Sequence, residues 1–286
     1  MALMIASSTA MSFGGLIVRS MDVAGPWQIN FYRSLGAFIA ISLILLVRYR
    51  GAAVSQLRCI GSAGLFGGVL LAAAGIAFLQ ALLNTTVANT LFTLSAIPFI
   101  AAVLAWVFLK ERLQRATLVT MAAAALGIFV MLAEGIGIGS IYGNAMALVT
   151  ACCFASYAVI ARYKRHIDMT PSLLVASALV ALVAVVAGQG DLGITLHDLL
   201  LCLLWGGILS GFSSCMFIVA SRHLGAAELT IFMLLEFALG PIWVWLFVSE
   251  VPTRWTLLGG AIVIAAVAIR AAVELRQRQR RFGITP

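Results

Sequence analysis

A carboxylate and a proline lie deep inside an apolar run that extends from about residue 226 to residue 248. About 20 apolar residues cross the ~30 Å hydrocarbon core of a membrane, so Glu236, about eleven residues into the run, is expected near the midplane, where an ionised carboxylate costs several kcal/mol. Pro241 lacks a backbone N–H, which leaves the carbonyl of Phe237 in need of another partner. The run predicts a broken span with an acid that faces a polar interior.

Arg33 is the basic residue expected inside a span, since it lies seven residues after Pro26 and therefore ~10 Å below the membrane surface. Its long side chain either faces the interior or extends back to the surface. Counting residues from both surfaces leaves ~4 Å between the depths of Arg33 and Glu236. The sequence thus allows a direct or water-bridged pair, or a zwitterion that bridges both, and the alternative is a protonated Glu236 bonded to neighbouring backbone.

Other polar and aromatic side chains within spans are further candidates for a binding site. Hydrocarbon offers them no hydrogen-bond partner, although Ser and Thr can bond to a carbonyl of their own helix. Deep aromatic rings either pack or form the apolar wall of a cavity. Besides Glu236 and Arg33, the substrate-binding candidates are Ser12, Tyr32, Gln80, Asn84, Asn89, Ser156, Tyr157 and Trp205. Pro98 and Pro241 are the candidate hinges, because each interrupts a span.

The composition places these residues in a membrane protein. Of the 286 residues, 63% are hydrophobic and 10% are charged, and the mean hydropathy is +1.11. Short connections with Gly, Pro, Asp or Arg separate the apolar segments, which run over residues 2–18, 26–47, 59–82, 86–109, 116–133, 141–161, 171–188, 198–220, 226–249 and 255–273. The fold class expected is an all-α integral membrane protein with ten transmembrane helices.

Basic residues are distributed unevenly over the connections. Fifteen of the 18 Lys and Arg fall on one side of the expected topology, Arg19 and Arg254 fall on the other, and Arg33 lies inside a span. Because basic residues accumulate on the cytoplasmic side, both termini are expected to be cytoplasmic. The net charge of +8 then reflects topology and lipid contact, and nucleic acid is not an expected partner.

The chain also repeats itself. Arg19 falls on Arg162 at an offset of 143, and residues 105–111 match residues 244–250 at an offset of 139. Five spans in each half invert the second half relative to the first, an arrangement used by secondary transporters around a site at the midplane. The expected units are a first five-helix repeat over 1–134, a second over 140–274 and a basic cytoplasmic tail over 275–286.

No catalytic or cofactor motif accompanies this pattern. The sequence has no phosphate-binding loop, nucleophile elbow or His-Glu-x-x-His motif, which argues against an enzyme and against ATP hydrolysis by this chain. The five cysteines lack metal-ligand spacing, and His166, His197 and His223 lie in connections. No cofactor, metal or ATPase subunit is therefore expected, and gradients are expected to supply the energy.

Several motifs resemble those of a known family. Pro98, a following apolar dozen and then Glu111-Arg112-Leu113 resemble the end of the first EamA repeat in the drug/metabolite transporter superfamily. The span with Glu236 resembles the second copy, and residues 147–162 and Arg33 also fit. The chain departs from the pattern at residues 11–14, which lack a frequent Trp, and at Phe237, which replaces a frequent Pro.

The resemblance covers almost the whole chain and implies the drug/metabolite transporter fold. Within the superfamily the chain resembles bacterial YddG-type amino-acid exporters, which implies export of aromatic and other amino acids across the bacterial cytoplasmic (inner) membrane by alternating access. The expected partners are a small amphipathic substrate and lipid. A nucleotide-sugar or other metabolite carrier, a cationic-drug efflux pump and a membrane-embedded enzyme are the alternatives.

Overall fold

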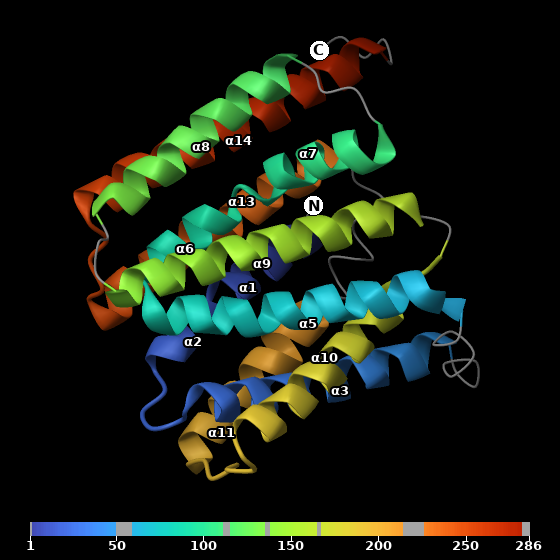
Figure 1. The fold of residues 1–286 in the computed structure, drawn as a ribbon, viewed down its shortest axis with the longest axis vertical. Helices are drawn as coiled ribbons and strands as arrows, with labels where there is room; N and C mark the ends of the chain where they lie inside the picture. Colours follow the sequence, from blue (N-terminus) through green and yellow to red (C-terminus); the bar gives the residue numbers. More distant parts are fainter. Residues whose placement is uncertain are drawn as a thin grey trace.

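The computed structural model describes residues 2–49, 59–110, 115–134, 138–164, 167–213 and 226–281, and the secondary structure in these ranges is helical (Figure 1). In chain order the elements are α1 (Ala2–Ser12), α2 (Gly14–Arg19), α3 (Pro26–Tyr49), α5 (Gly61–Asn84), α6 (Val87–Leu94), α7 (Ile97–Leu109), α8 (Arg115–Glu134), α9 (Ile138–Tyr163), α10 (Thr170–Ala187), α11 (Leu196–Leu203), the π-helix η2 (Leu204–Phe212), α13 (Ala226–Val248) and α14 (Arg254–Arg281).

Within the part of the chain that the structure describes, six helical segments are long and apolar enough to cross a membrane. They are Pro26–Tyr49, Gly61–Asn84, Val87–Leu109, Ile141–Tyr163, Thr170–Ala187 and Arg254–Val273, and shorter apolar helices cover Leu118–Val130, Leu196–Gly211 and Met233–Val248. Each of the ten predicted segments contains helix, which confirms the all-helical class. That all ten segments cross the membrane, and that the two halves are inverted, stays a prediction.

The helices pack as neighbours along most of their length. α5 lies against α9 and α10, α3 lies against α10 and η2, and α13 contacts α1, α2 and α6. In Figure 1, α8 and α14 run side by side at the top of the view, and α3 and α10 lie near the bottom. The short α1 and α2 lie among these longer helices, so span one has protein neighbours at its centre.

Spans one and four are interrupted near their centres. α1 and α2 are separated at Phe13, whose N–H bonds the Ala10 carbonyl at 3.3 Å, a tight i→i−3 turn. α6 ends at Leu94, whose carbonyl would have accepted the N–H that Pro98 lacks, and α7 begins at Ile97. The interruption predicted beside Pro98 is therefore present.

The prediction of a broken helix around Pro241 is wrong. α13 runs without interruption through this proline, which is buried. A proline inside a helix removes one backbone bond, and a membrane helix tolerates this loss where neighbouring helices pack against it. Span nine therefore remains one rod that carries Glu236 and Trp243 at a fixed spacing.

Asp198 fixes the connection between α2 and α3 to the first turn of α11. Its fully buried carboxylate accepts the backbone N–H groups of Asp22, Val23 and Ala24 at 3.1, 3.1 and 3.0 Å. The hydroxyl of Thr195 caps α11 by accepting the N–H of Asp198 at 3.2 Å. We call this end of the bundle the Asp198 end.

A second tie at the Asp198 end joins α2 to α13. Arg19 Nε and Glu250 Oε2 are 2.7 Å apart, and each residue also bonds backbone at the α5–α6 turn. Arg19 Nη2 donates to the Thr85 carbonyl at 2.9 Å, and Glu250 Oε1 accepts the N–H of Val87 at 2.8 Å. The end of α2, the α5–α6 turn and the connection after α13, which are far apart in sequence, are thus held together.

The opposite end of the bundle has a tie centred on Asp168, which precedes α10. Arg48 Nη2 lies 3.0 Å from its carboxylate, and the Tyr49 hydroxyl and Thr170 also donate to it. Burial alone raises the pKa of the Asp168 carboxyl, but the bonds from Thr170 and Tyr49 and the Arg48 cation outweigh burial and hold the pKa below its usual value. Asp168 is therefore ionised at neutral pH and ties α3 to α10.

We expect Asp198→Asn to lower the midpoint of thermal unfolding by at least ~4 °C. Hydrogen bonds to a charged acceptor contribute ~1.5–3 kcal/mol each, and 1 kcal/mol corresponds to roughly 2–4 °C in chains of 150–250 residues. Differential scanning fluorimetry of the purified protein in detergent measures the shift. The matched control is Asp191→Asn, because Asp191 is exposed and accepts one bond, from Gly193 at 3.1 Å. Equal shifts in both variants would contradict the anchoring role of Asp198.

Candidate substrate site

The guanidinium of Arg33 lies where α3, α5 and η2 meet. Its Nη2 donates to the Gly75 carbonyl at 3.0 Å and to Asn30 Oδ1 at 3.3 Å. Its Cζ lies 4.6 Å from the ring centroid of Trp205, within the range of a cation–π contact. Arg33 therefore stays in the interior, and the alternative that it extends back to the surface does not hold.

The partners of Arg33 in the described part of the chain are all neutral. The ion pairs found among the described residues join Arg19 to Glu250 and Arg48 to Asp168, at the two ends of the bundle. Beside Arg33, the Nδ2 of Asn30 is fully buried and has no hydrogen-bond partner in the described ranges. A deep cation and an unbonded amide donor thus lie next to each other on one face of α3, three residues apart.

Glycines allow η2 to reach Arg33. A Cβ on Gly206 would lie 1.8 Å from the Arg33 carbonyl oxygen, and a Cβ on Gly36 would lie 3.1 Å from the nitrogen of Gly207. The backbones of α3 and η2 are therefore in direct contact at these glycines. The π-helix widens the turn that carries Trp205, a feature that is frequent at functional sites and that hydropathy did not reveal.

Two tryptophans contact span one where it is interrupted. A Cβ on Gly14 would lie 2.9 Å from Trp205 Nε1, so this indole lies directly against α2. On the other side, Phe13 stacks on Trp243 of α13 with ring centroids 4.9 Å apart and an interplanar angle of 12°. We call Trp205, Phe13 and Trp243 the aromatic bridge, because they connect the surroundings of Arg33 to α13.

Ser12 supports the aromatic bridge. Its hydroxyl accepts the indole N–H of Trp243 at 2.9 Å and donates to the Thr9 carbonyl at 2.6 Å. Both bonds form at the last residue of α1, immediately before the interruption at Phe13. The candidate Ser12 therefore orients Trp243 in this conformation.

Glu236 precedes Trp243 by seven residues, which places both on one face of α13 about 10 Å apart along the axis. The residue is partly exposed, and its carboxylate forms no hydrogen bond or ion pair with the described residues. The direct Arg33–Glu236 pair that residue counting allowed is absent, because Arg33 is held by α3, α5 and η2 while α13 packs on α1, α2 and α6. The similar depths expected from residue counting therefore did not mean that the two side chains are close.

Gln80, Asn84 and Asn89 lie toward the Asp198 end. The Asn84 amide donates to the Gln80 carbonyl at 2.8 Å and to its Oε1 at 3.4 Å. Asn89 accepts from the Thr256 hydroxyl at 3.0 Å and donates to Asn144 at 3.4 Å, so it joins α6 to α14 and α9. In this conformation these three amides bond to one another or to neighbouring helices.

The remaining candidates bond to backbone. The Tyr32 hydroxyl donates to the Leu192 carbonyl at 2.8 Å, and that of Tyr157 donates to the Met169 carbonyl at 3.5 Å. Ser156 bonds the Cys152 carbonyl of its own helix at 2.8 Å and is partly exposed, as expected for a serine without a ligand. Of the sequence candidates, Arg33, Trp205 and Ser12 are the ones that the structure joins to the aromatic bridge.

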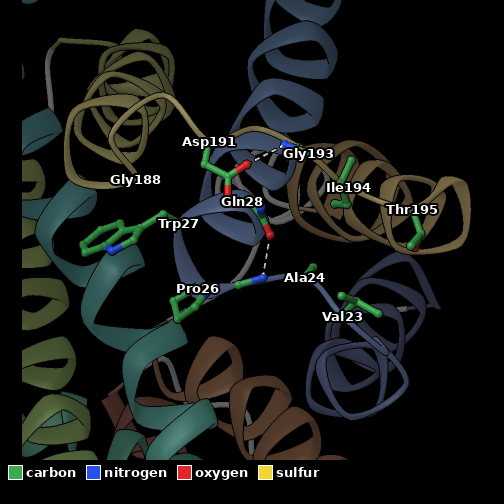
Figure 2. A pocket seen from close by; sticks show the side chains of 11 residues that line it. Val23, Ala24, Pro26, Trp27, Gln28, Gly188, Asp191, Gly193, Ile194 and Thr195 are labelled. Atoms are coloured by element: carbon green, nitrogen blue, oxygen red, sulfur yellow. Dashed lines mark hydrogen bonds between the residues drawn. The ribbon is translucent and has the colours of Figure 1, made fainter.

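A hollow of about 560 Å³ opens at the Asp198 end, and its α3 residues lie two to four positions before Asn30 and five to seven positions before Arg33 (Figure 2). Its lining comes from the α2–α3 connection, the start of α3 and the α10–α11 connection, and comprises Val23, Ala24, Gly25, Pro26, Trp27, Gln28, Gly188, Asp191, Gly193, Ile194 and Thr195. Gln28 accepts the N–H of Gly25 at 2.7 Å, and Asp191 accepts that of Gly193 at 3.1 Å, as the dashed lines show. These bonds fix the loops that form its walls.

The profile of the EamA-like transporter family matches residues 1–133 and again residues 141–271. The chain therefore belongs to the EamA-like transporter family, with two copies of the family domain. It is a multi-pass membrane protein of a family whose members are transporters and not enzymes.

A solved structure titled only "Crystal structure of protein" has a similar fold, with a TM-score of 0.66 and 17% sequence identity over 93% of this chain and 95% of the other. No curated protein matches the sequence. The substrate therefore has to be argued from the site.

Sequence reasoning missed several residues that shape this site. Asn30 precedes Arg33 by three residues, a spacing that signals a shared helix face, and could have been found. Trp243 carried no distinguishing spacing, and the Arg19–Glu250 tie joins residues 231 positions apart. Such pairings depend on helix packing, which one sequence does not specify.

We expect Gly206→Ala to disrupt the site and Gly207→Ala to preserve it. The new Cβ at position 206 would overlap the Arg33 carbonyl, whereas one at position 207 would meet its nearest atom, the Gly36 oxygen, at an ordinary 3.5 Å. Overpacking costs ~1–3 kcal/mol, so Gly206→Ala should lower the unfolding midpoint by several degrees. Scanning fluorimetry and size-exclusion elution report the difference. Similar unfolding midpoints and elution profiles for both variants would show that the position of η2 does not depend on close contact between Gly206 and α3.

Proposed function

We propose that this protein exports amino acids, including aromatic ones, across the bacterial cytoplasmic membrane by alternating access. The observation that carries the proposal is the pair of opposite charges, Arg33 and Glu236, on two helices that the aromatic bridge connects. An amino acid presents the same elements, namely an anion, a cation and an apolar body. The charges do not touch, so the substrate contacts them as it moves along the aromatic bridge.

The helix interruptions supply places where the bundle bends. Span one turns at Phe13, span four at Ser95–Ala96 before Pro98, and span eight changes to a π-helix at Leu204. We assign the hinge at span four to Pro98, because the missing donor there already separates α6 from α7. Pro241 lies in an unbroken helix, so in this proposal α13 bends less than span four.

The topology proposed has ten spans in two inverted repeats, 1–134 and 140–274, with a basic tail over 275–286 and both termini cytoplasmic. The distribution of Lys and Arg supports it, because fifteen of these residues fall on one side. The Asp198 end then faces outward, and its hollow is the outer mouth. Lipid surrounds the bundle, and neither a cofactor nor an ATPase subunit takes part.

A cationic-drug pump is the second candidate, and Glu236 is the observation that favours it. A partly exposed carboxylate in mid-span without a described partner suits an organic cation. A nucleotide-sugar carrier has less support. A diphosphate needs several cations, and the distribution of Lys and Arg over the connections leaves only Arg33 inside a span.

Proteoliposomes loaded with labelled phenylalanine should release it well above the rate of protein-free liposomes. We expect Glu236→Gln to slow release about tenfold or more and Glu236→Asp to retain more activity, because the aspartate keeps the charge. Measurements with and without a pH gradient separate driven from facilitative flux. Transport of ethidium without transport of any amino acid would replace the proposal with the drug pump.

Accessibility of single cysteines tests the topology. Cys59 is exposed at the Asp168 end, and Gly193 is exposed in the α10–α11 connection at the Asp198 end. In a variant whose other cysteines are replaced, Cys59 should react with a membrane-impermeant maleimide only after permeabilisation. Gly193→Cys, with Cys59 also replaced, should react in intact cells. The reverse pattern would invert the proposed orientation.

A further inference from the structure

We infer that Asn30 and Arg33 form a carboxylate-binding subsite, so that the substrate is recognised by its carboxylate and its ammonium group is dispensable for binding. The inference rests on the proposed function and narrows it, because it names the chemical group that selects the substrate. It also removes cationic drugs that lack a carboxylate from the substrate range.

The charge of Arg33 is the first argument. A cation in mid-span is costly without a counter-ion, and the described residues around Arg33 offer it only a carbonyl, an amide oxygen and an indole face. At both ends of the bundle, where water is close, this chain pairs Arg19 and Arg48 with carboxylates. The site at Arg33, where a counter-ion matters most, has no counter-ion among the described residues. In this inference the carboxylate of the ligand supplies the missing negative charge.

The free donors are the second argument. Both bonds of the Arg33 guanidinium come from Nη2, and its Nε and Nη1 have no partner among the described residues. Asn30 Oδ1 accepts one of these bonds, so the opposite side of the amide, the unbonded Nδ2, is a donor. A carboxylate has two oxygens that accept several N–H groups, and an ammonium accepts none.

The aromatic neighbour is the third argument. Trp205 covers the guanidinium on one face and packs near Phe78, with ring centroids 6.4 Å apart. A carboxylate bound at the edge of the guanidinium would hold the substrate body beside these rings. Arginine is suited to this task because its planar fork binds a carboxylate with two parallel bonds while its face stacks on an indole, which a lysine does not reproduce.

Three related compounds separate the possible recognition groups. Phenylalanine has both charges, 3-phenylpropionate has only the carboxylate, and phenethylamine has only the ammonium. With the full-length protein in detergent, we expect the first two to raise the unfolding midpoint with half-saturating concentrations within about tenfold of each other, and phenethylamine to have no effect. Stabilisation by phenethylamine but not by 3-phenylpropionate would overturn the subsite.

Asn30→Asp is the sharpest variant, because it is nearly isosteric and places a carboxylate next to the guanidinium. The new internal counter-ion should keep the midpoint at or above that of the wild type and raise the half-saturating concentration for 3-phenylpropionate at least tenfold. Asn30→Leu, which removes the donor without supplying a counter-ion, should also weaken binding but lower the midpoint. Unchanged binding by a folded Asn30→Asp protein would show that Asn30 and Arg33 are only structural.

The two proposals fail in different ways. If 3-phenylpropionate stabilises the wild-type protein and Asn30→Asp abolishes this effect, the subsite stands even when no amino acid crosses the membrane, and amino-acid export alone falls. If labelled phenylalanine is transported and Asn30→Asp transports it equally well, export stands and the subsite falls. If neither carboxylate binds and no amino acid is transported, both proposals fall.

Discussion

The absence of water from the hydrocarbon core is the constraint on which the rest of this structure depends, because each polar group there must find its partner within the protein. Arg33 shows its effect most clearly. Its guanidinium requires a carbonyl from α5, an amide from α3 and an indole from η2, and it therefore brings these three elements together. The contact in turn requires a glycine at position 206, since any Cβ there would overlap α3.

The same constraint explains why the irregular backbone lies where it does. A turn in the middle of a span exposes carbonyl and N–H groups, and the chain places such turns against protein and not against lipid. The turn at Phe13 is covered by Trp205 and Trp243, and Ser95 bonds the carbonyl of Phe92 beside the interruption in span four. Both interruptions are thus covered by protein side chains or bonded within their own span.

Hydropathy alone predicted the helices, since ~20 apolar residues admit few alternatives, and the proline at position 98 correctly marked an interruption. It failed where packing decides. Pro241 carries the same signal as Pro98, yet α13 stays whole because its neighbours tolerate one lost bond. Residue counting placed Arg33 and Glu236 at similar depths but says nothing about which helices adjoin. The π-helix that begins at Leu204 lies where η2 approaches α3, and hydropathy gave no sign of it. Residue types identified the charged members of the site, and only the fold identified their partners.

The Asp198 tie and the Arg19–Glu250 tie differ in the free energy needed to break them. The Asp198 carboxylate is fully buried and holds three backbone N–H groups, so pulling α11 away from the α2–α3 connection would leave four polar groups in need of partners. The Arg19 and Glu250 side chains keep 24% and 20% of their exposure, and water can replace each of them as a partner when they part. The Arg19–Glu250 tie is therefore the less costly of the two to break, whereas α1 and α2 also pack directly on α13. The stack of Phe13 on Trp243 belongs to this contact between span one and α13, while the stacking of Arg33 on Trp205 joins α3 to η2.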